Sequence, residues 1–403
     1  MSCKLYKVEK MSAKLYDSTH QFEPLLPSVR KEDLYAQAGR IVETSLKLTS
    51  AAHDTGRAAI RELVRSMNSY YSNRIEGQGT HPLNIEKALQ DNFSANPDIA
   101  KLQRIALAHI EAEKELEGFV DAGQPALTSG FLVAAHAALY SRLSAADRTL
   151  EDGYVIAPGK LREETVEVAR HIAPVPESIP EFLARMDEVY GKLLGWDNLL
   201  IGVACLHHRA AWVHPFRDGN GRATRLQSHC ALWTLSGGLW SPSRGLARAG
   251  QDYYAHLHNA DAPRRGDLDG RGNLTAAGLT EWVQFFLNVC EDQVSYMAKM
   301  LALDEMKRRI EALVTYRSAH DKSMRPQAIL PLYHAFAAGP MTRGEFAQMT
   351  GLGERTARSL LSHLLSTKLL VSDTQLGPVR FGLPLDALQF LLPQLYPEIN
   401  QVL

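Results

Sequence analysis

The sequence has few cysteines, and their placement suggests neither a metal site nor a disulfide framework. Cys3, Cys205, Cys230 and Cys290 are scattered over 403 residues, and none belongs to a CxxC pair. Single, separated cysteines are typical of buried thiols in a reducing compartment. We therefore expect a cytoplasmic protein without structural zinc.

Long apolar runs and a strong charge of one sign are also absent. The most apolar stretch, residues 199–213, is interrupted by His207, His208 and Arg209, so it falls short of the roughly 18 uninterrupted apolar residues of a membrane span. The first ten residues include several charges and no apolar segment, so we expect no secretory signal. Lys and Arg number 44 against 45 for Asp and Glu, which disfavours a protein that coats nucleic acid.

What the sequence does contain is typical of a globular protein made mostly of helices. Hydrophobic residues make up 45% of it and charged residues 22%, enough for a sizeable core. From about Lys31 the apolar residues recur at helical spacing. We expect an N-terminal arm and helix over residues 1–54 and a helical core over 55–320. Helices are expected at 55–77, 84–92, 98–118, 128–143, 178–194, 198–213, 222–236, 251–260 and 274–314.

One segment of the core breaks the helical pattern. Between Gly159 and Pro174, polar and apolar residues alternate at Thr165, Val166, Glu167 and Val168, as they do in a short strand. Glycine before the segment and prolines after it punctuate the chain. We expect an exposed β-hairpin at residues 159–174 in an otherwise all-α domain.

The C-terminal part, residues 326–403, has a pattern of its own. Helices are expected at 330–338, 343–350 and 354–367, followed by strands at 369–371 and 379–381. This order is typical of a winged helix-turn-helix domain of the α+β class. Its excess of basic over acidic residues is small for a DNA-binding surface, and DNA or protein binding both stay open.

The strongest local signal is a polar loop at residues 214–225, HPFRDGNGRATR. Gly219 and Gly221 flank Asn220 and permit a tight turn whose backbone N–H groups point inward as an anion nest. The turn opens a helix, and helix N-termini favour phosphate. The backbone of this loop therefore predicts a phosphate site.

The side chains of the loop complete that chemistry. Arg222 and Arg225 are three apart and project from one face of the helix, which suits a di- or triphosphate. Asp218 can hold Mg²⁺ against phosphate oxygens. His214 is a natural general base near neutral pH.

The loop resembles the signature of Fic-domain proteins, HxFx[D/E]GNGRxxR, at every specified position. The resemblance implies a compact helical bundle that transfers AMP from ATP to a protein hydroxyl. It implies that His214 deprotonates the target, Asp218 holds Mg²⁺, and Arg222 and Arg225 bind the β- and γ-phosphates. The nucleotide-binding set implied for the motif is Gly219, Asn220, Gly221, Arg222, Ala223, Thr224 and Arg225.

A second motif lies upstream, at the end of the helix expected over residues 55–77. A carboxylate in the last helical turn faces the negative end of the helix dipole, so Glu76 needs a cationic partner. Ser72, Glu76 and Gly77 match the inhibitory motif [S/T]xxxE[G/N] of the Fic family. The resemblance implies that Glu76 pairs with Arg225 and keeps the γ-phosphate out of its productive position.

The remaining site residues are implied more loosely. The hairpin at 159–174 occupies the place of the family's flap, so Thr165, Val166, Glu167 and Val168 would bind a target segment by strand pairing. Val168, Arg170 and His171 would lie near the nucleotide. Tyr254 and Asp261 would lie near its adenine and ribose.

The function expected from the sequence is an autoinhibited protein adenylyltransferase that uses ATP and Mg²⁺. Its partner would be a protein with a Ser, Thr or Tyr hydroxyl, and self-modification and a homodimer stay open. Two alternatives also stay open: an enzyme that reverses the modification as well, and a DNA-binding regulator whose Fic core senses nucleotide. No membrane association is expected.

Overall fold

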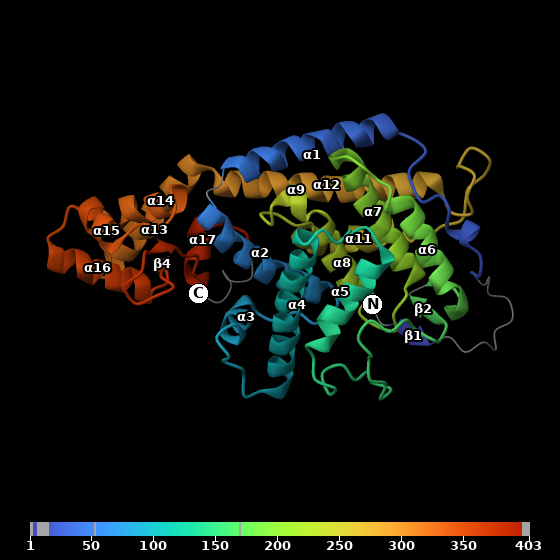
Figure 1. Cartoon of the computed structure of the whole chain (residues 1–403), viewed down its shortest axis with the longest axis horizontal. Helices are drawn as coiled ribbons and strands as arrows, with labels where there is room; N and C mark the ends of the chain where they lie inside the picture. Colours follow the sequence, from blue (N-terminus) through green and yellow to red (C-terminus); the bar gives the residue numbers. More distant parts are fainter. Residues whose placement is uncertain (1–2, 6–15, 52–53, 169–170, 397–403) are drawn as a thin grey trace.

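The fold is predominantly helical, as the sequence predicts. A computed structural model of the chain describes residues 3–5, 16–51, 54–168 and 171–396. Within them, helices build an elongated molecule that carries two small antiparallel sheets (Figure 1). Among the described helices, none is both long and apolar enough to cross a bilayer.

The helices of the core follow the expected ranges closely, with three differences. The stretch predicted as one helix at 274–314 is divided at Ala302, and the stretch at 222–236 is divided at Leu232. A short helix at 243–248 was not predicted. The helices are α1 (Lys31–Ala51), α2 (Asp54–Ile75), α3 (Pro82–Ala88), α4 (Pro97–Asp121), α5 (Ser129–Ser141), α6 (Ile179–Tyr190), α7 (Trp196–Val213), α8 (Asn220–Ala231), α9 (Trp233–Ser236), α10 (Ser243–Arg248), α11 (Gly250–Ala260), α12 (Ala276–Leu301) and α13 (Leu303–His320), with 3-10 turns at Thr19–Phe22 and Pro176–Ser178.

Helix α7 is the centre of the core. It packs against α1, α6, α8 and α12, and its residues from Leu200 to Ala210 are all buried. The polar side chains that interrupt its apolar run are buried with hydrogen-bond partners. His207 bonds to Ser228 Oγ (2.8 Å), and Arg209 Nη2 donates to the carbonyl of Pro24 (2.6 Å). Helix α7 can therefore be buried despite its polar residues, because each of them has a hydrogen-bond partner.

The predicted hairpin is present, and it gains a third strand. Strands β2 (Val166–Val168) and β3 (His171–Ile172) pair antiparallel. Strand β1 (Cys3–Leu5), from the N-terminal arm, pairs antiparallel with the other edge of β2. The expectation of an exposed hairpin edge is therefore wrong for β2, because residues of the same chain cover it.

The C-terminal part contains the three helices and two strands expected of it, and further elements that were not predicted. The expected ones are α14 (Ile329–Ala337), α15 (Arg343–Thr350), α16 (Glu354–Ser366), β4 (Leu370–Val371) and β5 (Arg380–Phe381). The others are α17 (Leu388–Leu391) and 3-10 turns at Pro326–Ala328 and Leu385–Ala387. Thr342 and Glu345 form a reciprocal capping box at the start of α15, which fixes its first turn. The winged-helix class itself stays a prediction.

The last residues that the structure describes, 394–396, lie against the core and contact α2. The Tyr71 hydroxyl donates to the carbonyl of Leu395 (2.8 Å). The rings of Tyr70 and Tyr396 meet edge to face at 5.4 Å, and Arg244 Nη2 donates to the carbonyl of Gln394 (2.9 Å). Helix α2, which ends at Ile75 directly before Glu76, is therefore held in place by residues that follow α17.

This packing predicts that removal of the Tyr71 hydroxyl group alone makes the folded protein less stable. Tyr71→Phe leaves the ring in place but leaves the buried carbonyl of Leu395 without that donor. We expect the free energy of unfolding to fall by about 1–3 kcal/mol, measured by urea denaturation of the full chain. Tyr316, whose ring is 54% exposed, provides the matched control, since Tyr316→Phe should change stability by less than about 0.5 kcal/mol. Equal stabilities of the two variants would contradict the account of this contact.

Candidate active site

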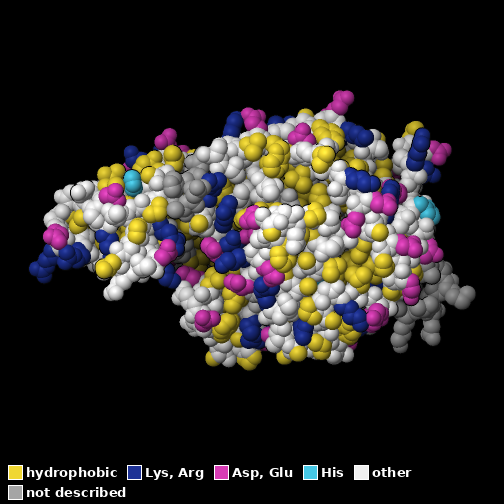
Figure 2. Space-filling model, viewed as in Figure 1, with side chains coloured by type: hydrophobic (Ala, Val, Ile, Leu, Met, Phe, Trp, Pro, Cys, Tyr) yellow, Lys and Arg dark blue, Asp and Glu magenta, His cyan; other side chains and the backbone are white. Residues whose placement is uncertain are grey.

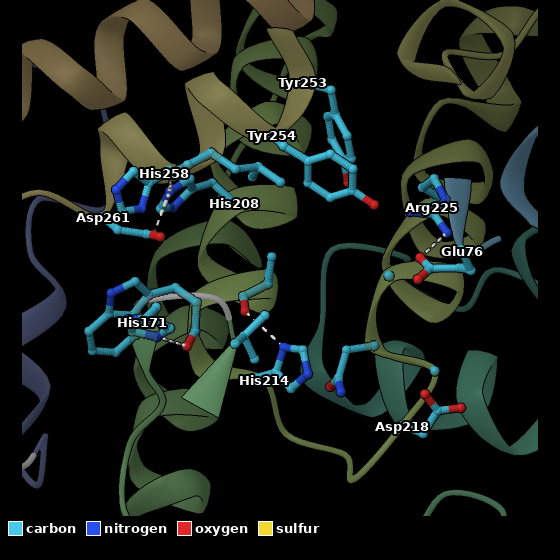
Figure 3. Close-up of a pocket in the computed structure, with 17 residues that line it drawn as sticks. Glu76, His171, His208, His214, Asp218, Arg225, Tyr253, Tyr254, His258 and Asp261 are labelled. Atoms are coloured by element: carbon cyan, nitrogen blue, oxygen red, sulfur yellow. Dashed lines mark hydrogen bonds and ion pairs between the residues drawn. The ribbon is translucent and has the colours of Figure 1, made fainter. Parts of the chain in front are cut away.

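A cavity of about 280 Å³ opens between α7, α8, α11 and the hairpin. Figure 3 shows Glu76, Arg225 and Asp218 at one end of it, His171, His208 and Asp261 at the other, and His214 between them. Tyr253 and Tyr254 line the side formed by α11. The structure thus gathers side chains from the loop, the upstream motif and the hairpin around one cavity.

The polar loop at residues 214–225, here called the active loop, has a backbone shaped by its two glycines. Gly219 has φ +80°, and a Cβ there would overlap the ring of Tyr140. A Cβ at Gly221 would overlap the Glu76 carboxylate. Between them, the Asn220 side chain accepts from the Phe216 N–H (2.9 Å) and donates to the Phe216 carbonyl (2.7 Å). The loop is closed by Asn220, and Gly221 leaves room for an anionic group at the N-terminus of α8.

Asp218 lines one end of the cavity, and two residues that do not line it, Arg222 and Tyr140, bind its carboxylate. Arg222 Nη2 lies 3.0 Å from Asp218 Oδ2 and 2.7 Å from the Tyr140 hydroxyl, and Tyr140 donates to Asp218. Burial would raise the pKa of Asp218, but Arg222 and the Tyr140 hydroxyl outweigh it and hold the pKa below its usual value. Asp218 is therefore ionised at neutral pH, as a ligand for a divalent cation must be.

His214 follows the last turn of α7 in a left-handed backbone conformation, with φ +49°. Its Nδ1 lies 3.3 Å from the carbonyl of Ala211. A carbonyl can only accept, so Nδ1 carries the proton and Nε2 keeps the lone pair. Burial, followed by the charge of Arg162, lowers the pKa of His214 to about 4. The imidazole is therefore neutral near pH 7 and able to accept a proton.

Arg162 connects the loop to the base of the hairpin. It is buried, and its guanidinium donates to the carbonyls of His214 (2.8 Å), Glu164 (2.7 Å) and Pro174 (2.6 Å). These acceptors lie just before and just after the two hairpin strands and at the entrance of the active loop. Arg162 thus fixes the position of the hairpin relative to His214.

Glu76 and Arg225 form an ion pair inside the site. Glu76 Oε1 lies 2.6 Å from Arg225 Nη2, and the Arg225 side chain is buried. Its Nε donates to Ser72 Oγ (2.9 Å) and its Nη2 to the carbonyl of Ser72 (3.1 Å). Gly77 has φ +72°, which reverses the chain directly after Glu76. The upstream motif therefore presents one carboxylate to Arg225 and holds the guanidinium with Ser72.

The charge of Glu76 is retained despite its burial. Burial would raise its pKa, but Arg225 and Arg222 outweigh that effect and hold the pKa below the usual glutamate value. A glutamate with a lowered pKa keeps its ion pair at neutral pH and loses it only in acid. The carboxylate against Gly221 is therefore an anion at a helix N-terminus, where the helix dipole favours negative charge.

A cluster of acidic residues and a histidine lies behind the ion pair, in the core. Glu113 and Glu117 of α4 and His229 of α8 lie close enough to share a metal ion. Arg65 donates to Glu117 (2.8 Å) and Asn68 to Glu113 (2.8 Å), so side chains of α2 bind one oxygen of each carboxylate. Burial would lower the pKa of His229, but the two glutamates raise it above its usual value. The cluster ties α2 to α4 and α8.

The other predicted nucleotide-binding residues divide into two groups. Val168, His171, Tyr254 and Asp261 line the cavity. His171 Nε2 donates to the carbonyl of Trp212 (2.7 Å), and His208 lies 3.2 Å from Asp261. Ala223 and Thr224 are buried within α8, so they shape the helix without lining the cavity. Arg170 lies outside the described residues.

Of the predicted target-binding residues, Thr165 precedes β2, and Val166, Glu167 and Val168 make up the strand. Val166 is fully buried, and Val168 borders the cavity. The strand therefore joins the packed base of the hairpin to the mouth of the site.

Three residues of the site are missing from the sequence prediction: His136, Tyr140 and Arg162. His136 Nδ1 accepts from the Gly159 N–H (2.9 Å) and Nε2 donates to the carbonyl of Asp218 (3.1 Å). His136 and Tyr140 are four apart on α5, so their spacing places both on one helix face. The sequence shows this spacing, but it does not show that α5 packs against α8. It therefore could not predict which residues His136 and Tyr140 contact.

The part of the chain that contains the loop at 214–225 resembles known proteins. Residues 126–232 match the model of the Fic/DOC family. Protein adenylyltransferase Fic of Nematostella vectensis is 25% identical over 197 residues, which are 48% of this chain and 42% of that protein. Protein adenylyltransferase fic-1 of Caenorhabditis briggsae is 30% identical over 122 residues, which are 30% of this chain and 23% of that protein. The match therefore spans less than half the length of either relative.

A solved structure resembles the fold as well. A fragment of Fic-1 from C. elegans superposes with a TM-score of 0.50 at 17% identity and covers 67% of this chain and 72% of that fragment. At this identity the likeness concerns the arrangement of the helices.

Proposed function

Because residues 126–232 match the model of the Fic/DOC family, we propose that the chain transfers AMP from ATP to a hydroxyl side chain of a protein and that Glu76 restrains this activity. The observation that carries the proposal is the Glu76 carboxylate, which packs against Gly221 and pairs with Arg225 (Figure 3). The loop whose backbone can bind an anion is thus occupied by a carboxylate of the same chain. The names of the two relatives support the choice of AMP transfer.

The chemistry assigned to the residues is in-line attack of the target hydroxyl on the α-phosphorus of ATP. His214 Nε2 takes the hydroxyl proton as the new O–P bond forms. The bond between the α-phosphorus and the β-bridging oxygen breaks, and pyrophosphate leaves. The loop N–H groups with Arg222 and Arg225 stabilise the charge on the leaving group. Asp218 would hold Mg²⁺, which would neutralise phosphate charge.

The direct test is to incubate the protein with ATP and a lysate of its source cell, followed by mass spectrometry of the modified peptides. We expect peptides that carry one AMP on Ser, Thr or Tyr, from a target or from the protein itself. A parallel sample with the His214→Ala protein identifies background. Absence of AMP from every peptide, with Glu76→Gly protein as well, would contradict the proposal.

The role of Asp218 predicts a metal requirement. Asp218→Asn keeps the shape of the side chain but removes its charge, so we expect AMP transfer to fall at least about tenfold. EDTA should abolish transfer by the wild-type site and weaken ATP binding measured by calorimetry. Asp152→Asn is the matched control, since Asp152 pairs with Arg217 outside the cavity. Transfer that continues unchanged in EDTA would remove the metal from the mechanism.

The alternative of a DNA-binding regulator receives little support from the surface. Figure 2 shows acidic and basic side chains interspersed over the visible face of the C-terminal part. Arg358 pairs with Glu354 (2.8 Å) and Arg380 with Asp373 (3.0 Å). Basic residues that already pair with acids release fewer counterions on binding DNA. We therefore do not propose DNA binding for this chain.

A further inference from the structure

The outer edge of the hairpin beside the active site is covered by the chain's own N-terminal residues. In the antiparallel pairing of β1 with β2, Cys3 is opposite Val168, Lys4 opposite Glu167 and Leu5 opposite Val166. The other edge of β2 pairs with β3. Among the described residues, β1 is therefore what occupies the edge to which an extended segment of another chain could add.

The backbone geometry identifies which pair of residues holds β1 in place. The Ala173 N–H donates to the carbonyl of Val166 (3.1 Å), so the polar backbone groups of Val166 point toward the β3 side. These groups alternate sides along a strand, so those of Glu167 point toward β1. Lys4 and Glu167 are then the pair that exchanges both hydrogen bonds.

The covered edge is held in a fixed position relative to the reacting groups. Val168 and His214 line the same cavity, and Arg162 bonds both to the base of the hairpin and to the carbonyl of His214. Residues opposite one another in an antiparallel pair project from the same face of the sheet. A segment paired with β2 therefore presents the side chain opposite Val168 toward the cavity.

The pairing of β1 with β2 is short enough to be displaced. It is three residues long, and the next described residue is Tyr16, whose carbonyl accepts from the Val175 N–H (2.9 Å) and whose ring meets Trp212 at 4.7 Å. So short a pairing is marginal by itself. A target segment that pairs with β2 over more residues can therefore displace it.

We propose that β1 occupies the docking edge for the protein substrate, and that the substrate must displace it with an extended segment antiparallel to β2. The hydroxyl residue of that segment lies at the register of Cys3, opposite Val168. This inference deepens the proposed function and rests on it. Strand β1 restrains the binding of the target protein, whereas Glu76 restrains the binding of the nucleotide. The two effects can therefore be measured separately.

The test compares Lys4→Pro, which removes the N–H that faces Glu167, with Lys4→Ala, which keeps it. Hydrogen exchange of the hairpin should become faster in Lys4→Pro and stay unchanged in Lys4→Ala. A synthetic peptide of residues 1–8 should bind the Lys4→Pro protein and restore slow exchange. Equal exchange in both variants, or no peptide binding, would overturn the occupancy of this edge by β1.

Kinetic measurements test whether this edge of β2 binds the protein substrate. All samples carry Glu76→Gly. If the edge is free about one-tenth of the time, the KM for the protein substrate should fall about tenfold in Lys4→Pro, with kcat unchanged. An unchanged KM alongside faster exchange would overturn the docking role. Peptide binding without any AMP transfer would instead contradict the proposed function and leave β1 on its edge.

Discussion

Replacing Glu76 with glycine is expected to raise AMP transfer by about one to two orders of magnitude, in self-modification and on a target. The substitution removes the carboxylate that pairs with Arg225 at 2.6 Å and that fills the space beside Gly221. Arg225 is then free to bind a phosphate, and the anion site at the start of α8 becomes open to ATP. The gain is measured as AMP incorporated per minute at saturating ATP and matched protein concentration.

Two further variants separate this explanation from a general loosening of α2. Adding Arg225→Ala to Glu76→Gly should lower transfer again, because the released arginine is what the first substitution supplies. Glu151→Gly alters an exposed glutamate in a turn and should leave transfer unchanged. Equal transfer by wild type and Glu76→Gly would refute the inhibitory role of Glu76.

The second large effect is the loss of transfer in His214→Ala. In the Glu76→Gly background we expect a decrease of about 10²- to 10⁴-fold, the usual contribution of a general base. ATP affinity should stay within about threefold, because the loop N–H groups and arginines remain. His320, an exposed histidine on α13, gives the control His320→Ala. Retained transfer in His214→Ala would remove this residue from the mechanism.

The pH dependence of the same enzyme provides a second measure of His214. Its pKa is lowered to about 4, so the base form persists well below the usual histidine range. The acid limb of kcat/KM reports the base of the free enzyme. We expect kcat/KM to be level through pH 6.5 and to fall only as the pH approaches 4. A fall centred near pH 6.5 would indicate that His214 is more exposed to water than the structure has it.

The sequence predicts the helices and the active loop because both depend on local patterns. Apolar periodicity marks the helices, and the loop concentrates its reactive residues within twelve positions. The pairing of Glu76 with Arg225 is implied only through the family resemblance. Without that resemblance, the sequence predicts only that Glu76, at the end of a helix, has a cationic partner.

What the sequence could not predict depends on contacts between distant segments. Tyr140 reaches Asp218 only because α5 packs against α8. Arg162 donates to four carbonyls that are separated by up to 50 residues in the chain. From the sequence, residues 3–5 are expected in an N-terminal arm and no strand is predicted there, since three residues with no clear alternation carry no strand signal of their own. Whether such a segment forms a strand depends on the strand edge that it meets, here the edge of β2.

The central claim is that this site transfers AMP and that Glu76 restrains it, and one labelling experiment tests both parts. The Glu76→Gly and wild-type proteins are each incubated with ATP that is labelled either at the α-phosphate or at the γ-phosphate, and protein-bound label is counted after denaturation. We predict covalent label from the α-phosphate only, and more of it in Glu76→Gly than in wild type. Label from the γ-phosphate, or no covalent label in Glu76→Gly, would contradict the account.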